Sequence, residues 1–478
     1  MAKKEMNRGF LLGGREIFDG EEIEIRSPWN QSLTGTVKQA SRSHAAEAVR
    51  LLTESFAKTR KLAGYERKQI LQSIAEKIAA QKHDLAQLIV AEAGKPLKAA
   101  RVEVERAILT FTTAAEEAVR EGGEVLSLDL LKGNEGRWGM VRRFSAGPVF
   151  AITPFNFPLN LVAHKLAPAL ALGSPVLLKP APQTPFCSLK LGDFLLEAGW
   201  PSDAIAVMPL ANEDAEFLVE HEERLKVLSF TGSAKVGWAL KQKAAKKRVL
   251  LELGGNAAVI VHSDWPDLAA SAQKIVAAGT SYAGQSCISV QRVYVERSVF
   301  NEFLKHAMEA AGTLVAGDPA NEATDVGPVI RLSDAERIET WIDEARAAGA
   351  TVLTGGSREG CMVEPTLLTG TRSPMKVLDE EVFAPVITIE PYDDFEVVLG
   401  EVNRSRYGLQ AGLFTRDAGR IFHAYDALDV GGLIVGDTPT WRLDPMPYGG
   451  VKDSGLGREG IRYAMEEMTD RKLLVMAL

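Results

Sequence analysis

The sequence predicts an α/β protein in which helices cover both faces of a mainly parallel sheet. Helical periodicity dominates the segment before Trp138, and short apolar runs alternate with helical stretches after it. Such alternation is typical of parallel sheets, because each crossover helix carries the chain back so that the next strand runs in the same direction. A chain of 478 residues also exceeds one comfortable hydrophobic core, so we expect two or more domains.

Three helices are predicted before the first of these strands. The first has Ser43 as its cap and runs to Leu62, because polar and apolar residues follow at helical spacing. The second covers residues 66–93 and ends at Gly94, and the third covers residues 97–120.

Short apolar runs bounded by glycine, proline or polar residues are predicted to be strands. In chain order the first six are PVFAIT, PVLLK, AIAVMPL, KVLSFTG, RVLLELGG and NAAVIVH. Helices are expected at residues 184–198, 213–220, 234–246, 266–278, 298–315 and 333–348. Later strands are expected in TVLTGG, APVITIEPY and GGLIVG, so a second α/β domain should begin near Gly254.

Composition and charge exclude several classes of protein. The chain is 46% hydrophobic and 25% charged with a net charge of -8, which is ordinary for a globular protein and indicates no nucleic-acid partner. The most apolar stretch, residues 159–178, is broken by charged residues and prolines, so no membrane span is expected, and the N-terminus lacks a signal-peptide core. Three cysteines form no disulfide framework, which favours a cytoplasmic location. The seven histidines form no metal motif, so no metal is expected.

Cys287 is the candidate nucleophile. It lies where a predicted helix passes into a strand, and Gly284, Gln285 and Ser286 leave little side-chain bulk over it. A reactive thiol needs such approach space and a free backbone N–H. The alternative is a buried, inert cysteine, which describes the other two cysteines well.

Glu252 is the candidate base. It is the lone carboxylate of the apolar run VLLELGGN and precedes two glycines. Burial there would raise its pKa toward neutrality, which suits a base that acts on water. The alternative is that Glu252 faces solvent on an alternating strand.

Three further segments follow predicted strands and carry polar groups. In TPFNFPLN, the amide of Asn156 either donates to an oxyanion or caps a turn. Lys179, in LLKPAPQTP, fits a ribose or phosphate contact, and its alternative is a surface lysine. In SFTGSAKVGW, Gly232 and Ser233 open a helix whose free N–H groups suit a phosphate, although the spacing is not GxGxxG.

Taken together and in order, these segments resemble the aldehyde dehydrogenase superfamily over nearly the whole chain. The motifs that carry the resemblance are TPFNFP, LLKPAPQTP, FTGSAKVG, LELGGN, GQSCISVQR, EEVFAPV and YGGVKDSGLGRE. It implies a Rossmann-like cofactor domain (residues 1–121 and 145–253), an α/β catalytic domain (254–451) and a small β oligomerisation flap (122–144 and 464–478) in a homodimer or homotetramer.

The resemblance also implies a role for each candidate. Cys287 matches the thiol that adds to an aldehyde, Asn156 matches the amide that holds the oxyanion, and Glu252 matches the base that hydrolyses the thioester. The residues that match contacts to NAD or NADP are Thr153, Pro154, Phe155, Lys179, Gly232, Ser233, Glu381 and Phe383. Pro182 stands where NAD-preferring relatives often carry a glutamate, so both cofactors remain open.

Substrate recognition is expected in the segment DTPTWRLDPMP and on the helix that carries Arg106. Arg442 falls in that segment, and with Arg106 and Tyr448 it borders the aldehyde tunnel implied by the resemblance. An arginine there can fork onto a carboxylate, sulfonate, phosphonate or phosphate, and the alternative is that Arg442 pairs with Asp444 or another acid. We expect a short, polar aldehyde with an anionic end as the favoured case: a semialdehyde, lactaldehyde, or a phospho- or sulfo-aldehyde.

Two other functional classes remain open on the residues alone. A cysteine hydrolase or amidase would use Cys287 and Glu252 without a nicotinamide. A non-catalytic binding protein on the same fold would need neither residue, so the presence of both argues against it. The presence of Glu252 also argues against acyl transfer to coenzyme A or phosphate.

Overall fold

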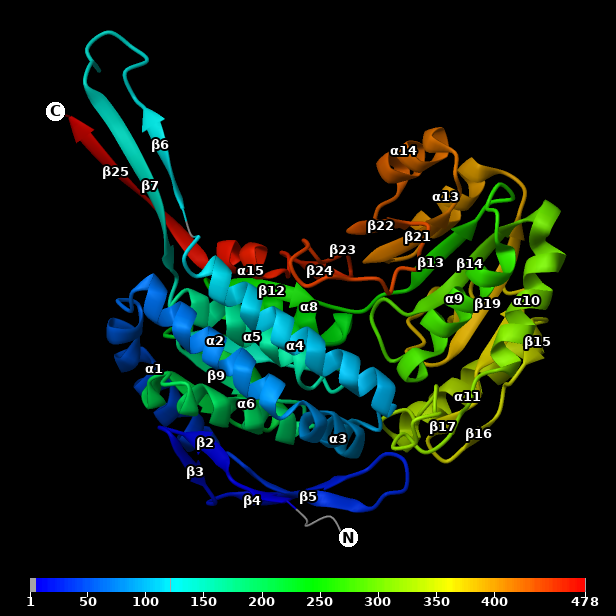
Figure 1. Cartoon of the computed structure of the whole chain (residues 1–478), viewed down its shortest axis with the longest axis horizontal. Helices are drawn as coiled ribbons and strands as arrows, with labels where there is room; N and C mark the ends of the chain where they lie inside the picture. The colour runs from blue at the N-terminus through cyan, green and yellow to red at the C-terminus, as the bar shows by residue number, and fades with distance from the viewer. Residues whose placement is uncertain (1–5, 121, 478) are drawn as a thin grey trace.

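The computed structural model describes residues 6–120 and 122–477. The expectations that concern residues 1–5, Glu121 and Leu478, at the ends of the predicted cofactor domain and flap, therefore lie outside the described residues. Two bodies, each built on one large sheet with helices around it, lie side by side, and a β arm projects from one of them (Figure 1).

The first sheet has eight strands in the order β24-β12-β11-β8-β9-β10-β2-β3. The five central strands run parallel, and antiparallel pairs close both edges. This confirms the predicted parallel sheet. The bounds are β2 Phe10–Leu12, β3 Arg15–Ile17, β8 Val149–Ile152, β9 Val176–Lys179, β10 Ile205–Val207, β11 Val227–Thr231, β12 Arg248–Glu252 and β24 Gly455–Leu456.

Helices pack on both faces of this sheet. They are α1 Arg42–Thr59, α2 Gly64–Ala80, α3 Lys82–Ala93, α4 Leu97–Glu117, α5 Asn160–Ala171, α6 Pro185–Glu197, α7 Asn212–His221 and α8 Ala234–Lys243. Every residue of α5 is buried, which explains why this stretch is the most apolar of the sequence. Among the described residues, no helix is long and apolar enough to cross a membrane.

Three helix boundaries differ from the prediction. Ser41, not Ser43, caps α1, because its hydroxyl accepts from the backbone N–H of His44. The predicted helix over 66–93 is two helices, since Gln81 leaves helical dihedrals with φ −113° and ψ 23°. The third helix ends at Glu117 rather than residue 120.

The second sheet has seven strands in the order β15-β18-β19-β14-β13-β21-β22, all parallel except the edge strand β15. Its strands are β13 Ala257–Val261, β14 Val290–Glu296, β15 Thr351–Thr354, β18 Thr366–Thr369, β19 Val386–Tyr392, β21 Gln410–Phe414 and β22 Gly432–Val435. Its helices are α9 Leu268–Thr280, α10 Phe300–Gly312, α11 Leu332–Ala347, α12 Lys376–Asp379, α13 Phe395–Asn403 and α14 Ala418–Ala427. The chain passes from one sheet to the other between Glu252 and Ala257.

Two helices in this part, predicted to begin at Ser298 and Ser333, begin at other residues. Ser298 lies inside a short 3₁₀ helix (η3, Arg297–Val299), so α10 begins two residues later at Phe300. Ser333 lies inside α11, whose cap residue is Arg331. In both cases the backbone turns before the serine, so its hydroxyl is not at the helix end.

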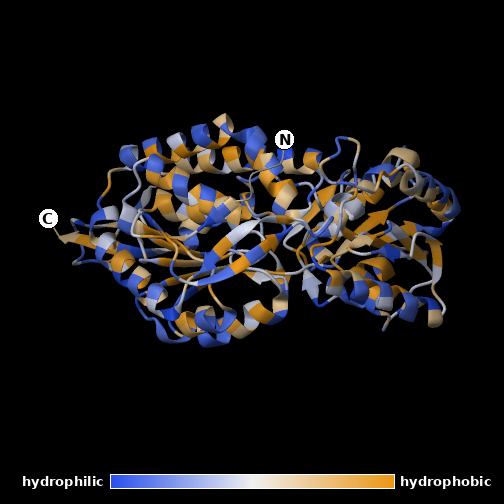
Figure 2. Ribbon diagram, turned by 90° about the horizontal axis from the view of Figure 1, so that it is seen from below, coloured by the Kyte–Doolittle hydropathy of each residue, from blue (hydrophilic) through white to orange (hydrophobic). Residues whose placement is uncertain are grey.

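Smaller elements complete the fold. A three-stranded sheet of β1 Met6–Arg8, β5 Leu33–Gln39 and β4 Glu21–Arg26 lies beside α3. Two short ladders join β16 Arg358–Glu359 to β17 Met362–Val363 and β20 Tyr407–Gly408 to β23 Val451–Lys452. Further helical turns are η1 Ser202–Ala204, η2 Ser281–Gly284 and α15 Ile461–Glu467. In Figure 2 the strands inside both bodies are rich in apolar residues, whereas the surrounding helices mix apolar and polar positions.

The arm is an antiparallel sheet of β6 Gly123–Ser127, β7 Arg137–Ser145 and β25 Thr469–Ala477. The apolar C-terminal strand β25 pairs with β7 of its own chain over nine residues. β25 is an edge strand of this sheet. Large apolar side chains are exposed along the arm, namely Val125, Leu126, Leu130, Leu131, Leu473, Leu474 and Val475.

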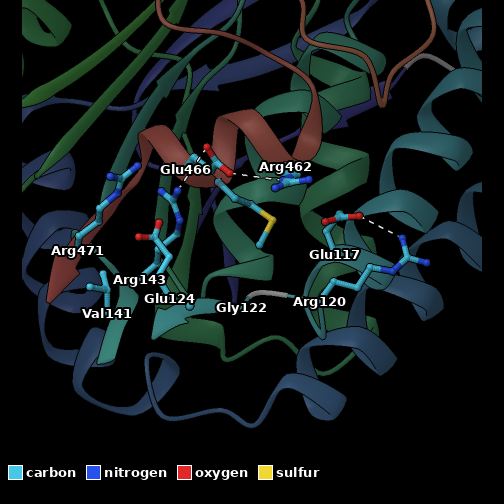
Figure 3. Close-up of a pocket in the computed structure, with 11 residues that line it drawn as sticks. Glu117, Arg120, Gly122, Glu124, Val141, Arg143, Arg462, Glu466 and Arg471 are labelled. Atoms are coloured by element: carbon cyan, nitrogen blue, oxygen red, sulfur yellow. Dashed lines mark hydrogen bonds and ion pairs between the residues drawn. The ribbon is translucent and has the colours of Figure 1, made fainter. Parts of the chain in front are cut away.

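A pocket of about 600 Å³ lies where the arm meets α4 and α15 (Figure 3). Its charged groups largely satisfy one another: Arg143 and Arg462 each lie 3.5 Å from Glu466, and Arg120 lies 3.1 Å from Glu117. None of the candidate catalytic residues lines this pocket, so it is a polar junction between the arm and the body.

The α4 helix supplies a test of the core. Phe111 is fully buried in the main hydrophobic cluster, so Phe111→Ala should destabilise the protein by about 3–5 kcal/mol through lost burial and a residual cavity. Val102 lies on the same helix and is 60% exposed, so Val102→Ala should change stability by less than about 0.5 kcal/mol. Urea denaturation followed by circular dichroism measures both, and equal midpoints for the two variants would contradict this packing.

Candidate active site

The Cys287 thiol lies between η2 and β14 and keeps partial exposure. Its Sγ is 2.9 Å from the hydroxyl oxygen of Tyr448. Burial is the main influence on the thiol and raises its pKa to about 12, although the Tyr448 hydroxyl and the Arg442 charge act in the opposite direction. The resting cysteine is therefore a protonated thiol near neutral pH and needs a base before it can attack.

A turn of left-handed residues brings the chain to Cys287. Tyr282, Ala283 and Gly284 all have positive φ, at 49°, 52° and 68°. Such a conformation is costly for residues with a side chain, so the surrounding packing must hold it. A Cβ on Gly284 would lie 2.1 Å from the carbonyl oxygen of Ala384, so this position admits only glycine.

Glu252 is the last residue of β12 and is 6% exposed, so the alternative of a solvent-facing glutamate is wrong. Burial is the largest of the effects that hold its pKa well above the usual range, and the nearby carboxylate of Glu459 adds to it. Arg442 and Lys165 act against this shift. A buried carboxyl group with a raised pKa fits a proton acceptor that works near neutrality.

Asn156 lies in the loop after β8 and is 5% exposed. Its Nδ2 donates to the backbone carbonyl of Gln285 over 2.9 Å, which ties this loop to the segment before Cys287. A side-chain amide has two N–H donors, so this bond leaves one for another acceptor. Within the described chain, no hydrogen bond is recorded for the backbone N–H of Cys287.

Gly254 and Gly255 lie in the segment that crosses between the two sheets, and they leave room for Glu381 and Cys287 to approach its backbone. The backbone N–H of Gly255 donates to Glu381 Oε1 over 2.9 Å, and a Cβ on Gly254 would lie 2.3 Å from Glu381 Oε2. A Cβ on Gly255 would lie 2.0 Å from the carbonyl oxygen of Cys287. Burial, the main influence on Glu381, raises its pKa to about 7.

Phe383 completes this wall of the site. It has a positive φ of 54°, and its ring meets that of Phe155 edge to face with centroids 6.0 Å apart. The loop of residues 153–156 and the segment of residues 381–383 are thereby joined through their aromatic rings.

Several polar residues lie at the carboxyl ends of the first sheet's central strands. Lys179, at the end of β9, is 5% exposed, and burial alone lowers its pKa to about 8. The alternative of a surface lysine is therefore wrong. The buried hydroxyl of Thr153 makes no hydrogen bond within the described residues, and its backbone N–H donates to the carbonyl of Lys179. Ser233 caps α8 by accepting from Val236, and Gly232 lies directly before it.

Arg442 is buried and paired with an acid, as the alternative for this residue foresaw. Its Nη2 donates to Glu459 Oε2 over 2.9 Å, whereas Asp444 lies 3.9 Å from its Nε. Its guanidinium carbon lies 3.7 Å from the centre of the Tyr448 ring. Arg106 donates to Asp444 over 2.6 Å. The three residues expected near the substrate are thus linked, with Tyr448 between Arg442 and Cys287.

A buried charged cluster behind these residues was not foreseen from the sequence. Glu459 lies 3.7 Å from Lys165 and pairs with Arg442; burial works against its ionisation, but the charges of His164, Arg442 and Lys165 prevail and lower its pKa to about 2. His164 Nε2 is 2.9 Å from Asp444 Oδ1. One signal was available: His164 and Lys165 interrupt an otherwise apolar helix.

The arrangement suits covalent chemistry on a carbonyl group. It combines a thiol, a buried carboxyl group that influences the pKa of that thiol, and an amide with one N–H donor left. Within residues 6–120 and 122–477, no three His, Cys, Asp or Glu side chains are grouped as metal ligands would be.

Known proteins are similar to this chain in sequence and in fold. Residues 17–474 match the aldehyde dehydrogenase family. The chain is 41% identical over 471 residues to 3-sulfolactaldehyde dehydrogenase of Priestia aryabhattai, covering 98% of each protein. Aldehyde dehydrogenase 21 of Physcomitrella patens, solved with the reaction product succinate, superposes with a TM-score of 0.97 at 40% identity, covering 99% of both chains.

A third relative is glyceraldehyde-3-phosphate dehydrogenase of Methanocaldococcus jannaschii, solved with NADP. It superposes with a TM-score of 0.92 at 36% identity, covering 97% of this chain and 100% of that one. These matches extend over nearly the full length of each partner, as the resemblance of the motifs predicted. The chain belongs to the aldehyde dehydrogenase family, whose members are oxidoreductases.

Proposed function

We propose that this enzyme oxidises a short aldehyde with an anionic far end to its carboxylate, with NAD or NADP as the oxidant. One observation carries the proposal: Tyr448 joins the thiol to a buried guanidinium. Its hydroxyl lies 2.9 Å from Cys287 Sγ, and its ring face lies 3.7 Å from the guanidinium carbon of Arg442. The guanidinium therefore lies within about 9 Å of the sulfur, a gap that three or four carbon atoms fill.

Donors remain at this guanidinium although it is paired. A guanidinium carries five N–H donors, and the recorded bonds of Arg442 to Glu459 and His164 use Nη2. The buried Nε atoms of Arg442 and Arg106 make no hydrogen bond within the described residues. Arg106 is also 25% exposed at its side chain, so an anion can reach it from solvent. Remaining N–H donors of this kind suit a carboxylate, sulfonate or phosphate.

The charge of the cluster also favours an anion. The guanidinium groups of Arg106 and Arg442 pair with the carboxylates of Asp444 and Glu459, which these ion pairs keep ionised. Lys165 lies 3.7 Å from Glu459, and burial lowers its pKa. The raised pKa of Glu252 reduces its negative charge at neutral pH. The two guanidinium groups stay charged at neutral pH and can attract an anionic substrate.

The relatives support this class of substrate. The Priestia enzyme acts on a sulfonated aldehyde, the Physcomitrella enzyme was solved with succinate as its product, and the Methanocaldococcus enzyme acts on a phosphorylated aldehyde. All three molecules are short and carry an anionic group at the end opposite the reacting carbon.

The chain's own residues fit a nicotinamide dinucleotide. Among the residues that the structure describes, Lys179 is a buried cation without an ion-pair partner, and the buried hydroxyls of Thr153 and Thr231 make no hydrogen bond. We propose that Lys179 and the Gly232–Ser233 turn hold the nucleotide end, and that Thr153, Pro154, Phe155, Glu381 and Phe383 hold the nicotinamide end. When bound, the cofactor accepts hydride. Pro182 places no carboxylate against a 2′-phosphate, so either cofactor fits.

The reaction begins at Cys287. Its thiol proton passes through water to Glu252, whose raised pKa lets it hold that proton. The sulfur then adds to the aldehyde carbon, and the oxygen becomes an oxyanion. The second N–H of Asn156 and the backbone N–H of Cys287 stabilise this oxygen, an arrangement worth about 3–4 kcal/mol in other enzymes.

Hydrolysis completes the cycle. Once hydride has left the tetrahedral carbon, the acyl group remains on Cys287 as a thioester. Glu252 passes the thiol proton to solvent and, ionised again, removes a proton from water, because water alone is a poor nucleophile at neutral pH. The hydroxide attacks the thioester carbon, and the C–S bond breaks with its electron pair on the sulfur. Glu252 returns its proton to the Cys287 thiolate, and the acid product ionises to its carboxylate as it leaves.

We also propose that the chain consists of three functional parts. The cofactor domain comprises residues 1–121 and 145–253, the catalytic domain comprises 254–451, and the oligomerisation flap comprises 122–144 and 464–478. The separation of the two large sheets between Glu252 and Ala257 supports the first boundary. The exposed apolar side chains of the arm support a homodimer or homotetramer built on this flap.

Substrate selection is tested through Arg106 and Arg442. Arg106→Ala and Arg442→Lys should each lower kcat/KM for succinic semialdehyde about 10-fold or more relative to neutral propanal, because they remove or reshape donors to the carboxylate. Arg101 lies on the same helix and pairs with Glu322 at the surface, so Arg101→Ala should leave the ratio unchanged. If both variants kept the wild-type ratio of kcat/KM for succinic semialdehyde to kcat/KM for propanal, the proposed anion site would be wrong.

Glu252 is tested by burst kinetics and by pH. Glu252→Gln should release at most about one equivalent of reduced nicotinamide, read at 340 nm and more slowly than the wild type, and then stall at the thioester. Cys287→Ala should give no burst. In the wild type, kcat should fall as pH falls through the raised pKa of Glu252, because only the ionised form accepts a proton from water. Full steady turnover in Glu252→Gln would contradict this role.

Assembly is tested on the arm. Leu474 is 48% exposed on β25, so Leu474→Lys should shift the protein to a smaller assembly, measured by light scattering after gel filtration, because a charge on the edge strand opposes pairing. Leu332 is 49% exposed on α11, away from the arm, and Leu332→Lys is the matched control. A mass that Leu474→Lys leaves unchanged would argue against a subunit contact there.

A further inference from the structure

A buried elbow between α3 and α4 contacts both loops that carry the oxyanion donors. Gly94, with φ 64°, ends α3, and Lys95 and Pro96 lead into α4. Lys95 is 1% exposed, and so is Glu103 on the next helix. An ion pair joins Lys95 Nζ to Glu103 Oε2. Such a pair contributes little net stability by itself, which raises the question of what it does there.

The carboxylate of the pair holds the exit of the Asn156 loop. Glu103 Oε1 accepts from the backbone N–H of Leu159 over 2.9 Å and from that of Asn160 over 3.1 Å. These are N–H groups at the beginning of α5, which have no partner within the helix. Glu103 therefore acts as the cap of α5 from another helix and fixes where the loop of residues 153–159 ends.

The cation of the pair lies between two aromatic rings, one from each loop. Lys95 Nζ is 3.6 Å from the centre of the Phe157 ring and 4.4 Å from the centre of the Tyr282 ring. Phe157 follows Asn156 by one residue, and Tyr282 opens the left-handed turn that leads to Cys287. The Tyr282 hydroxyl also donates to the carbonyl of Ala93 over 3.1 Å. A desolvated ammonium between two ring faces is strongly attracted to both.

The two loops meet again at the oxyanion donors themselves. Asn156 Nδ2 donates to the Gln285 carbonyl, and the Gln285 side chain donates to the Tyr282 carbonyl over 3.3 Å. At most two hydrogen bonds separate either ring on Lys95 from the amide of Asn156 or the N–H of Cys287. A displacement of either ring would therefore also displace these donors. The ion pair reaches neither group directly.

We propose that Lys95 and Glu103 are positioning residues that set the relative placement of Asn156 and the Cys287 N–H, and so complete the oxyanion site. The inference rests on the proposed role of Asn156. The pair touches neither substrate nor cofactor. Glu103 holds the loop of residues 153–159 by capping α5, and Lys95 holds both loops through its contacts with Phe157 and Tyr282.

A double-mutant cycle tests the proposal in the full-length enzyme. Asn156→Ala should slow the burst of reduced nicotinamide by about 10²- to 10³-fold. Lys95→Met should slow it by about 10- to 100-fold, with the cofactor Kd within about twofold of wild type. Lys95 acts through Asn156, so adding Lys95→Met to Asn156→Ala should slow the burst by no more than about threefold. Lys95→Arg, which keeps the charge and the ring contacts, should recover part of the rate.

The controls separate positioning from loss of fold. Glu92 is also buried and caps α6 by accepting from the backbone N–H of Phe186 and that of Cys187, so Glu92→Gln should lower Tm without a comparable loss of burst rate. If Lys95→Met does not fold, Phe157→Leu removes one ring without exposing a buried charge and should show the same non-additivity with Asn156→Ala. Additive losses, or a burst rate that follows Tm equally in all variants, would overturn the inference. An unimpaired Asn156→Ala enzyme would instead overturn the role of Asn156.

Discussion

The site depends on a backbone contact that side chains would forbid. At the crossing between the two sheets, Gly255 lies against the carbonyl of Cys287, and Gly254 lies against the carboxylate of Glu381. This contact brings the end of β12, with Glu252, beside the loop that carries the thiol. The two sheets supply different groups, and neither holds the thiol, the carboxyl group and the amide by itself. The reacting groups therefore meet only because the chain can cross here without a Cβ.

Local sequence patterns were sufficient for most of the fold. The apolar runs became parallel strands because nearly continuous apolar residues suit a sheet that is covered on both faces. Boundaries were less well predicted: Gln81 breaks a helix without glycine or proline, and Ser41 caps α1 although Ser43 has the same hydroxyl two residues later. Which serine caps depends on where the preceding strand delivers the chain, and no short window of sequence contains that information.

The candidate site divides in the same way. Cys287, Glu252 and Asn156 were identified because each stands out locally and because the ordered motifs resemble one family. The pairings around them were not identified: Arg442 with Glu459, His164 with Asp444, and Lys95 with Glu103 behind two aromatic rings. The first two link different parts of the chain, and the third depends on rings that folding brings together. The structure identified these pairings because it shows that the charged groups are buried, and an ionised group removed from water needs a partner.

The protonated state of the resting Cys287 thiol also affects how readily peroxide can oxidise and inactivate the enzyme. Peroxides attack thiolates far faster than thiols, and burial holds the pKa of this thiol at about 12. The idle enzyme therefore offers peroxide little of the reactive species, and conversion of the sulfur to sulfenic acid is confined to the brief interval in which the proton has left. The burial of Cys287 therefore both protects the sulfur from oxidation and makes its attack on the substrate depend on a base.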